Sequence, residues 1–237
     1  VAVFTSGALP EFILDDLKRF LAVPPEARFR FVCNLNEPRD MSASEAERLY
    51  AFLSAFGTHV APGFNIYRPD FDLLFLADVI DRYGMRRDIR LGMAAPIPDS
   101  ENACLDVDEL PQALSRLSEQ LPALQERRLT LGLDCGFPLC MFTDADLGRL
   151  WKNAHAMNFG CGPAIDIGPD LQVWSCFPLR RESPRSLFEF QSLQQLHQHF
   201  DDVLKTLRDE TGGILPECGT CSYRESGKCA GGCVAHI

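Results

Sequence analysis

The chain lacks both a long apolar run and a basic N-terminal leader. No apolar run reaches the roughly 18 residues that a membrane-spanning helix needs. The opening stretch VAVFTSGALP has neither the charged start nor the long apolar segment of a secretory signal. We therefore expect a protein without a membrane span that works in the cytoplasm, where thiols stay reduced.

Positive charge is also scarce. The 237 residues include 23 Lys and Arg against 33 Asp and Glu, so the formal net charge is −10. Surfaces that bind polyanions are usually basic, and we expect no nucleic-acid partner. Low-complexity tracts are absent as well, and 46% of the residues are hydrophobic. Such a chain can form one large domain with a real core and a small appendage.

Cysteine, by contrast, is in excess, with ten residues in the chain. An even number leaves a disulfide framework open, but disulfide scaffolds are mostly small secreted chains that cannot build a core. In a reducing compartment, clustered thiols more often bind metal. Six of the cysteines lie in the last third of the chain: Cys161, Cys176, Cys218, Cys221, Cys229 and Cys233.

Apolar stretches alternate with amphipathic helical stretches through the first two thirds of the chain. The stretches expected to be strands are 1–5, 28–35, 59–67, 88–97 and 128–134. Strands that alternate with helices in this way predict βαβ units and a parallel sheet. The strands are nearly continuous apolar runs, which is typical of a sheet covered on both faces. An open α/β sheet and part of a barrel both fit this pattern.

Capping residues mark the predicted helices. Ser42 and Glu45 form a capping-box pair at the start of one helix. Asp70 begins the next helix, which Gly84 closes. A later helix extends to His155, for which we expect a surface or capping role, with metal ligation as the alternative.

The pattern changes near residue 159. In the stretch AIDIGPDLQVWSC, apolar and polar residues alternate on both sides of Gly168-Pro169-Asp170, which predicts a β-hairpin with its turn at these three residues. A helix over 187–207 and the cysteine-rich tail follow. We therefore divide the chain into an α/β part, residues 1–159, and a small hairpin–helix–loop module, residues 160–237, that needs bound metal to hold its shape.

The spacing of the module cysteines favours an iron–sulfur cluster. The two pairs of the tail, Cys218-x2-Cys221 and Cys229-x3-Cys233, are separated by seven residues. Zinc sites usually separate such pairs by roughly twelve to twenty residues. Six thiolates also exceed the four ligands of a tetrahedral site, which points to one cluster with spare ligands or to two clusters. Zinc, disulfides and unliganded thiols remain the alternatives.

The four remaining cysteines carry weaker signals. Cys33 and Cys104 stand alone, and free cysteine is among the most buried residue types, so we expect core packing. Cys135 and Cys140 follow a predicted strand end, where a parallel α/β fold carries its chemistry. Either could be an additional cluster ligand or a pocket thiol, although ordinary loop and core positions are the favoured interpretation.

The module resembles a known family. The segments CGPAIDIGPDLQVWSC and CGTCSYRESGKCAGGC are similar to the auxiliary-cluster module of radical S-adenosylmethionine (SAM) enzymes, the SPASM or twitch domain. The similarity covers residues 161–233 and all six module cysteines. Leu171 stands where that family commonly has glycine, and a further downstream cysteine is absent. The resemblance therefore implies either one auxiliary 4Fe–4S cluster or two clusters of which one lacks a ligand here.

The first part of the chain resembles the later strands of a radical SAM partial barrel. Its first strand ends in Thr5-Ser6-Gly7, similar to the Thr-Asn-Gly of the family's third strand. The resemblance implies that Ser6, Asn34 and Asn65, near predicted strand ends, face bound SAM, with turn capping as the alternative. The family's CxxxCxxC and Gly-Gly-Glu-Pro segments lie upstream of that strand and are absent here. We expect an N-terminally truncated barrel, with a remnant that has lost catalysis as the rival.

The resemblance also implies a function for the intact protein. A radical SAM enzyme reduces SAM to a radical that abstracts a substrate hydrogen, and auxiliary clusters bind substrate or carry an electron. The substrate would be a small molecule, a peptide or a protein. Two other classes stay open, namely a non-catalytic iron–sulfur protein acting as partner or recognition subunit, and a zinc-stabilised α/β protein unrelated to radical chemistry.

The absence of CxxxCxxC predicts that this chain alone does not cleave SAM reductively. The radical-generating cluster needs three cysteines at that spacing, which leave one iron open to SAM. The iron-reconstituted chain, incubated with SAM and dithionite, should therefore release 5′-deoxyadenosine only at the level of a protein-free control. Product above that background contradicts the prediction.

Overall fold

Six parallel strands form the main sheet of the computed structural model, which describes residues 2–22, 29–162 and 164–237. The first residues of the predicted strands 1–5 and 28–35 fall outside these ranges. Neighbours in the sheet follow chain order, from β1 to β6. Their bounds are β1 Ala2–Thr5, β2 Arg30–Asn34, β3 Val60–Ile66, β4 Asp88–Met93, β5 Thr130–Leu133 and β6 Ala154–Ala156. The predicted parallel α/β arrangement is confirmed.

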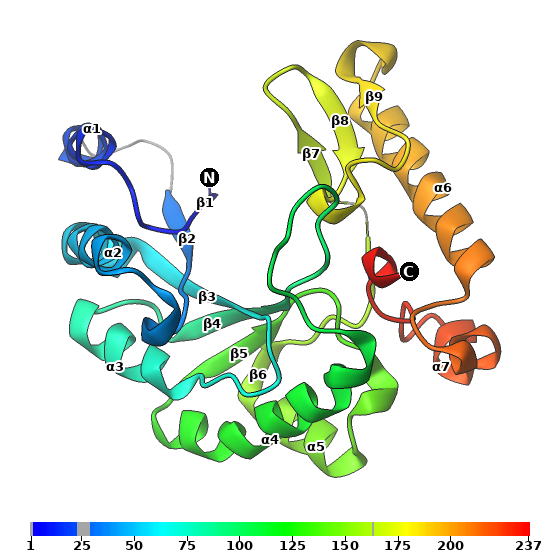
Figure 1. Ribbon diagram of the computed structural model, residues 1–237, viewed down its shortest axis with the longest axis horizontal. Helices are drawn as coiled ribbons and strands as arrows, with labels where there is room; N and C mark the ends of the chain where they lie inside the picture. The colour runs from blue at the N-terminus through cyan, green and yellow to red at the C-terminus, as the bar shows by residue number, and fades with distance from the viewer. Residues whose placement is uncertain (1, 23–28, 163) are drawn as a thin grey trace.

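Helices α1 to α5 lie along one side of this sheet (Figure 1). Right-handed crossovers between strands that are neighbours in chain order place every connecting helix on the same side. The predicted capping box of Ser42 and Glu45 is present, and Gly84 closes α3 with a φ of +62°. The bounds are α1 Glu11–Ala22, α2 Ala43–Phe56, α3 Leu74–Tyr83, α4 Leu110–Glu126 and α5 Asp144–Asn153. This one-sided order differs from the expected sheet with cover on both faces and is compatible with a segment of a βα barrel.

The two faces of the sheet differ in chemistry because side chains alternate along each strand. The helix-covered face carries large buried side chains, among them Phe31, Phe64 and Leu91. The opposite face, called the inner face below, carries glycine and polar residues at the alternate positions. These are Asn34, Gly63, Asn65, Arg90, Gly92, Gly132 and Asp134. The apolar core thus lies between the sheet and its helices, and the polar groups face the other way.

Helix α3 begins later than its capping pattern predicts. Asp70 does not start it, since the helix runs from Leu74. The N–H of Leu73 instead donates a hydrogen bond of 2.6 Å to Oε1 of Gln120, a buried side chain on α4. This long-range bond replaces the local cap and holds residues 71–73 outside the helix.

Strand β6 also differs from the prediction, which placed His155 on a helix. Helix α5 ends at Asn153, and β6 pairs with β5 beside Gly132. A Cβ added to Gly132 would lie 2.6 Å from Nε2 of His155. The absence of a side chain at Gly132 therefore makes room for the histidine and for the pairing of the two strands.

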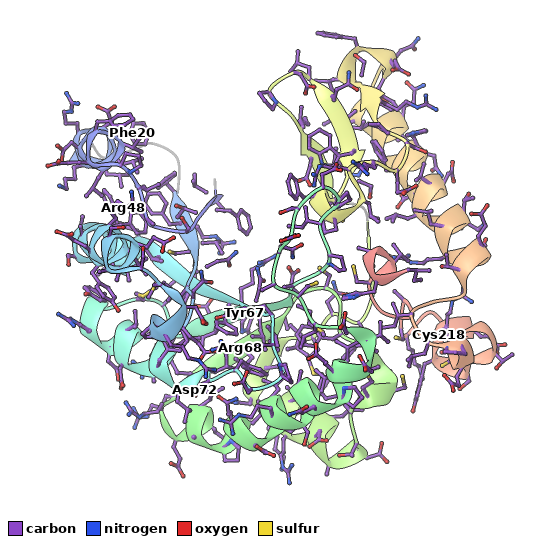
Figure 2. The ribbon with its side chains drawn as sticks, viewed as in Figure 1. Phe20, Arg48, Tyr67, Arg68, Asp72 and Cys218 are labelled. Atoms are coloured by element: carbon purple, nitrogen blue, oxygen red, sulfur yellow. The ribbon has the colours of Figure 1, made fainter. Side chains whose placement is uncertain are left out.

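An ionic network joins the loops that follow β2 and β3. Buried Glu37 accepts a hydrogen bond of 2.8 Å from Arg68, and Asp40 accepts bonds from Arg68 and from the hydroxyl of Tyr67. The Tyr67 bond lowers the pKa of Asp40, while burial raises the pKa of Tyr67 to about 12. Figure 2 shows Tyr67 and Arg68 together at these loops. The network fixes the positions at which two strands leave the sheet.

A second, antiparallel sheet opens the module of residues 160–237. It comprises β7 Ile165–Ile167, β8 Gln172–Ser175 and β9 Arg185–Ser186. The hairpin predicted around Gly168-Pro169-Asp170 is confirmed. Leu171 adopts a φ of +61° in its turn. Glycine adopts this left-handed conformation without steric cost, whereas leucine is strained in it. The auxiliary-cluster module that the sequence resembles commonly has glycine at this position.

The module continues with α6 Leu193–Thr211 and the short α7 Ser222–Glu225. The predicted helix 187–207 starts later than expected because residues 187–189 form a 3-10 turn and Ser192 caps α6 by accepting from the N–H of Gln195. The module's buried apolar clusters are small: Val173, Leu196 and Phe200 form one, and Leu179, Leu204 and Val234 the other. No helix within the described ranges combines the length and the apolar character that crossing a membrane requires.

Several contacts hold the module against the α/β part. Arg180 donates to the carbonyl of Pro98, and Ile214 packs on the large core of the sheet. The N–H of Ala230 donates a bond of 2.8 Å to the carbonyl of Phe159. Figure 1 shows the C-terminal turn lying between α6 and the loops of the sheet. These contacts place the cysteine-rich tail beside the carboxyl ends of the strands.

Candidate metal centre

A cavity of about 520 Å³ opens where β3, β4 and β5 end. Asn65, Met93 and Asp134 line it from the sheet, while the hairpin and the tail close it from the module. Active sites of parallel α/β folds lie at this carboxyl-terminal edge. Four thiols line this one cavity: Cys135, Cys161, Cys176 and Cys233.

The hairpin brings two of these thiols to the same end of the module. Cys161 lies before β7, and Cys176 directly follows β8. The N–H of Cys176 donates a bond of 2.6 Å to the carbonyl of Ala164, which closes the hairpin next to Cys161. Cys176 has a φ of +50°, a left-handed conformation that turns the chain sharply out of the strand. The predicted proximity of Cys161 and Cys176 is thus consistent with their shared cavity.

The four thiols of this cavity act on one another electrostatically. Burial, with smaller contributions from the charges of the other three thiols, raises the pKa of Cys176 to about 12. Burial likewise raises the pKa of Cys135 to about 11, with Asp134, Cys233 and Cys161 adding to the shift. Cys135 is solvent-accessible at the cavity wall, but the protein around the cavity still disfavours its charged form. Cys135 and Cys176 are therefore neutral at neutral pH.

The other three module cysteines gather in the tail. Cys218 and Cys229 are buried, and Cys221 is half-buried. The N–H of Cys221 donates to the carbonyl of Cys218, and the N–H of Gly231 donates to Sγ of Cys229 at 3.4 Å. Sγ of Cys218 lies 4.0 Å from the carbonyl oxygen of Gly231. The CxxC turn and the Ala-Gly-Gly segment therefore pack directly on one another.

Glycines make this close approach feasible. Gly213 and Gly231 have φ values of +135° and +80°, which side-chain-bearing residues rarely adopt. A Cβ on Gly213 would lie 2.6 Å from Cβ of Cys218, and one on Gly231 would lie 3.2 Å from Cα of Gly213. Gly232 also has a positive φ, of +82°. The lack of side chains in this segment leaves room for the chain around Gly213 and for the thiol of Cys218.

Cys140 lies on the sheet side, exposed in the turn Leu139–Met141. Burial raises its pKa first, and the charges of Cys229, Cys218 and Cys221 raise it further. The next residues of its loop lead to Phe142, whose ring packs on Phe159 at a centroid distance of 6.0 Å. Since the carbonyl of Phe159 binds Ala230, this loop lies against the tail.

Cys33 and Cys104 lie apart from these groups. Cys33 is fully buried in the main core beneath Gly7, and burial raises its pKa to about 12, so the expected packing role is confirmed. Cys104 is half-buried, and burial together with the charges of Asp106 and Glu109 raises its pKa. No other thiol contributes to the pKa shift of either residue.

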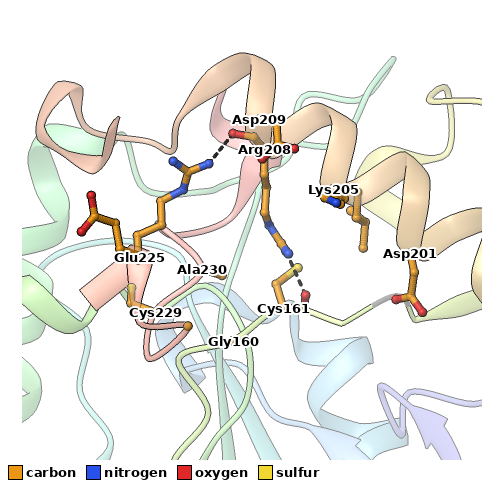
Figure 3. A pocket seen from close by; sticks show the side chains of 12 residues that line it. Gly160, Cys161, Asp201, Lys205, Arg208, Asp209, Glu225, Cys229 and Ala230 are labelled. Carbon is orange, nitrogen blue, oxygen red and sulfur yellow. Dashed lines mark hydrogen bonds between the residues drawn. The ribbon is translucent and has the colours of Figure 1, made fainter. Parts of the chain in front are cut away.

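Two arginines of the module surround the thiols with positive charge. Arg208 donates a bond of 2.9 Å to the carbonyl of Cys161, and Arg224 donates to the carbonyl of Arg208 (Figure 3). A second cavity, of about 490 Å³, has both Cys161 and Cys229 in its wall beside Arg208. Nε of Arg208 is buried without a partner among the described residues. An unpaired donor beside several thiols suits a negatively charged group.

The residues expected to face SAM occupy different surroundings. Ser6 is exposed in the loop after β1. Asn34 and Asn65 lie on the inner face, each next to a glycine of the following strand, Gly63 and Gly92 respectively. Oδ1 of Asn34 is buried without a partner in the described part of the chain, and Asn65 lines the thiol cavity. Their role toward SAM stays a prediction.

A polar group on the inner face was not apparent from the sequence. Arg90 pairs with Asp134 across β4 and β5, and its guanidinium lies over the ring of Phe4. His155 faces the same region and lies 3.4 Å from Oγ1 of Thr130. Together with Arg90 and Asp134 it lines a cavity of about 250 Å³ distinct from the one that holds the thiols. The ligand hypothesis for His155 therefore gains no support.

Comparisons with known proteins leave the chain without an assigned family. No protein-family model matches it, and neither does any curated protein. Among the described residues, no three His, Cys, Asp or Glu side chains lie close enough together to hold a single metal ion. The thiolates of a four-iron cluster each bind a different iron and stand wider apart, so that finding concerns single ions.

Gly213→Ala tests the packing of the tail. The new methyl group would clash with Cys218 in a backbone conformation that alanine disfavours, at a cost of about 1–3 kcal/mol. We expect faster limited proteolysis within residues 212–233 of the metal-free protein. Gly219→Ala is the matched control, because a Cβ there meets nothing within 4 Å. Equal cleavage of the two variants contradicts the proposed packing.

Proposed function

We propose that this chain holds auxiliary iron–sulfur clusters of the radical SAM type next to a partial βα barrel. One observation carries the proposal. Cys161, Cys176 and Cys233, from the segments that resemble the auxiliary-cluster module, line one cavity at the carboxyl ends of the strands. These residues come from three separate places in the sequence, and ordinary core packing gives no reason for them to converge.

The residues of the cavity suit an iron–sulfur cluster. The donors are thiols, the ligand type on which such clusters depend. As thiolates they would repel one another, so a positively charged group between them would be needed to hold them. The unpartnered Nε of Arg208 adds a donor nearby. Four thiols line a cavity of about 520 Å³, which has room for a group larger than a single zinc ion.

The protein would control the site through its own side chains. A bound cluster supplies one-electron transfer or an iron that can bind substrate. The thiolates of the module hold it, and Arg208 offsets their negative charge. Met93, Ile97 and Phe177 give the cavity an apolar wall that limits water, which tunes the potential of a cluster.

The α/β part supports a radical SAM-type protein more loosely. Its strands follow chain order with helices on one side, as in a segment of a βα barrel. The inner face presents Asn65, Arg90 and Asp134 to a space where a cofactor and a substrate could bind. In the intact protein we propose an enzyme that modifies a small molecule, a peptide or a protein.

A non-catalytic iron–sulfur protein is the second candidate. The absence of CxxxCxxC from the sequence favours it, since this chain then binds clusters but generates no radical. It would serve as a partner or recognition subunit of an enzyme. The two candidates share the cluster sites and differ only in whether a radical-generating cluster belongs to the same polypeptide.

Anaerobic purification tests the cluster proposal. The reconstituted chain should be brown, absorb broadly in the visible range and contain iron and acid-labile sulfide in equal amounts. Iron should fall sharply in Cys176→Ala and Cys233→Ala, whereas Cys33→Ala and Cys104→Ala should keep the wild-type content. A colourless chain that carries zinc in place of iron after reconstitution contradicts the proposal and supports the zinc-stabilised alternative.

A further inference from the structure

The loop that follows β5 carries two thiols, Cys135 and Cys140, on the sheet side of the metal centre. We propose that this loop supplies one ligand to each of two separate four-thiol sites. The first site comprises Cys135, Cys161, Cys176 and Cys233, and the second comprises Cys140, Cys218, Cys221 and Cys229. The inference rests on the proposed function, because it divides the same thiols into two clusters and assigns the fourth ligand of each.

The first site is defined by a shared cavity. Cys135 comes from the sheet, and the other three thiols come from the module, yet all four line the same walls. The N–H of Cys176 closes the hairpin on the carbonyl of Ala164, which brings Cys176 back beside the segment of Cys161. A shared cavity wall is the placement that four ligands of one centre need.

The second site is defined by the contacts of the tail. Cys218 and Cys229 both contact Gly231 through their sulfur atoms, and the N–H of Cys221 donates to the carbonyl of Cys218. The loop of Cys140 reaches the tail through the packing of Phe142 on Phe159 and the hydrogen bond from Ala230 to Phe159. The two sets of four have no member in common, and they account for every cysteine outside Cys33 and Cys104.

The loop itself is built to present its thiols. Phe137 and Phe142 are buried in the main core, at 1% and 7% exposure, whereas Cys135 and Cys140 are exposed. Gly136 has a φ of +95° and packs on Met93, which turns the chain between the first thiol and its aromatic anchor. Metal ligands are usually held rigidly by the packing of the residues beside them, as the two phenylalanines hold this loop. An exposed thiol without a ligand is open to oxidation, which a bound cluster would prevent.

This assignment completes both sites within the printed sequence. The segments that resemble the auxiliary-cluster module contain only six cysteines, two fewer than two four-thiol sites need. The β5 loop, which precedes these segments in the sequence, supplies the other two. Each cluster then connects the α/β part to the module, through Cys135 in one site and Cys140 in the other. Loading the clusters should therefore fasten the two parts of the chain to each other.

Iron stoichiometry tests the number of sites. The reconstituted wild-type chain should bind about eight irons and about eight sulfides, four of each for every four-iron cluster. Cys135→Ala and Cys140→Ala should each lose about half of the iron, or convert one cluster to a three-iron form seen by EPR. Cys104→Ala is the matched control and should keep all of it. Far-UV circular dichroism verifies that each variant is folded.

Paired substitutions test how the thiols are divided. Cys135→Ala with Cys233→Ala removes two ligands of one site and should lose no more iron than about half. Cys140→Ala with Cys229→Ala should behave in the same way. Cys135→Ala with Cys140→Ala removes one ligand from each site and should lose nearly all. Equal losses for the three pairs contradict the division into two sites.

Alkylation of the wild-type chain provides a test without substitution. Iodoacetamide should label the accessible Cys135 and Cys140 in the iron-free protein, slowly because their raised pKa values keep them protonated, and far less in the loaded protein. Cys104 should react alike in both states. Peptide mass spectrometry reads out the labelling of each cysteine.

The outcomes separate the two proposals. A wild-type chain that binds no iron after reconstitution refutes the proposed function and this inference together. A chain that binds about four irons, or that keeps all of its iron in Cys135→Ala and Cys140→Ala, refutes only the assignment of the β5 loop. Unprotected Cys135 and Cys140 in the fully loaded protein refute it as well.

Discussion

The gathering of several thiols around one cavity is the constraint on which the proposed metal centre depends. Four thiols line one cavity, and burial together with their neighbours raises the pKa of Cys176 to about 12 and that of Cys135 to about 11. Several thiolates can occupy such a space only if a cation neutralises them. Binding a cluster would release their protons, so cluster affinity and the local fold become coupled.

The module shows why that coupling is needed. Its apolar clusters hold only a few buried residues each, and the tail has no regular sheet of its own. The tail keeps its shape through glycines in left-handed conformations and through hydrogen bonds such as that from Ala230 to Phe159. Small domains with too little core commonly rely on metal for stability. The large core of the α/β part has no such need.

The sheet contributes a rigid base and a polar inner face. Helices cover one side, while Arg90 and Asp134 pair on the other, and the Glu37–Arg68 network fixes the loops after β2 and β3. The thiol cavity begins where this inner face ends. A substrate bound against the polar groups would therefore lie close to the proposed clusters, as electron transfer requires.

The sequence by itself determined the features that depend on near neighbours along the chain. The alternation of strands and helices, the capping box of α2 and the hairpin around Gly168-Pro169-Asp170 all follow from residues a few positions apart. The six module cysteines were also recognisable, because their spacing is local. Cys135 and Cys140 carried a weaker signal, because no residue near them in the sequence indicates what they would contact.

Only the tertiary structure decided which thiols meet. Cys135 shares a cavity with Cys161, Cys176 and Cys233 because the module folds back onto the strand ends, and the loop of Cys140 lies against the tail for the same reason. Strand β6 forms because Gly132 leaves room for His155, and α3 starts late because Gln120 on α4 binds the N–H of Leu73. Each of these features depends on a contact between segments that are distant in the sequence. The free energy of such a contact cannot be inferred from the pattern of neighbouring residues.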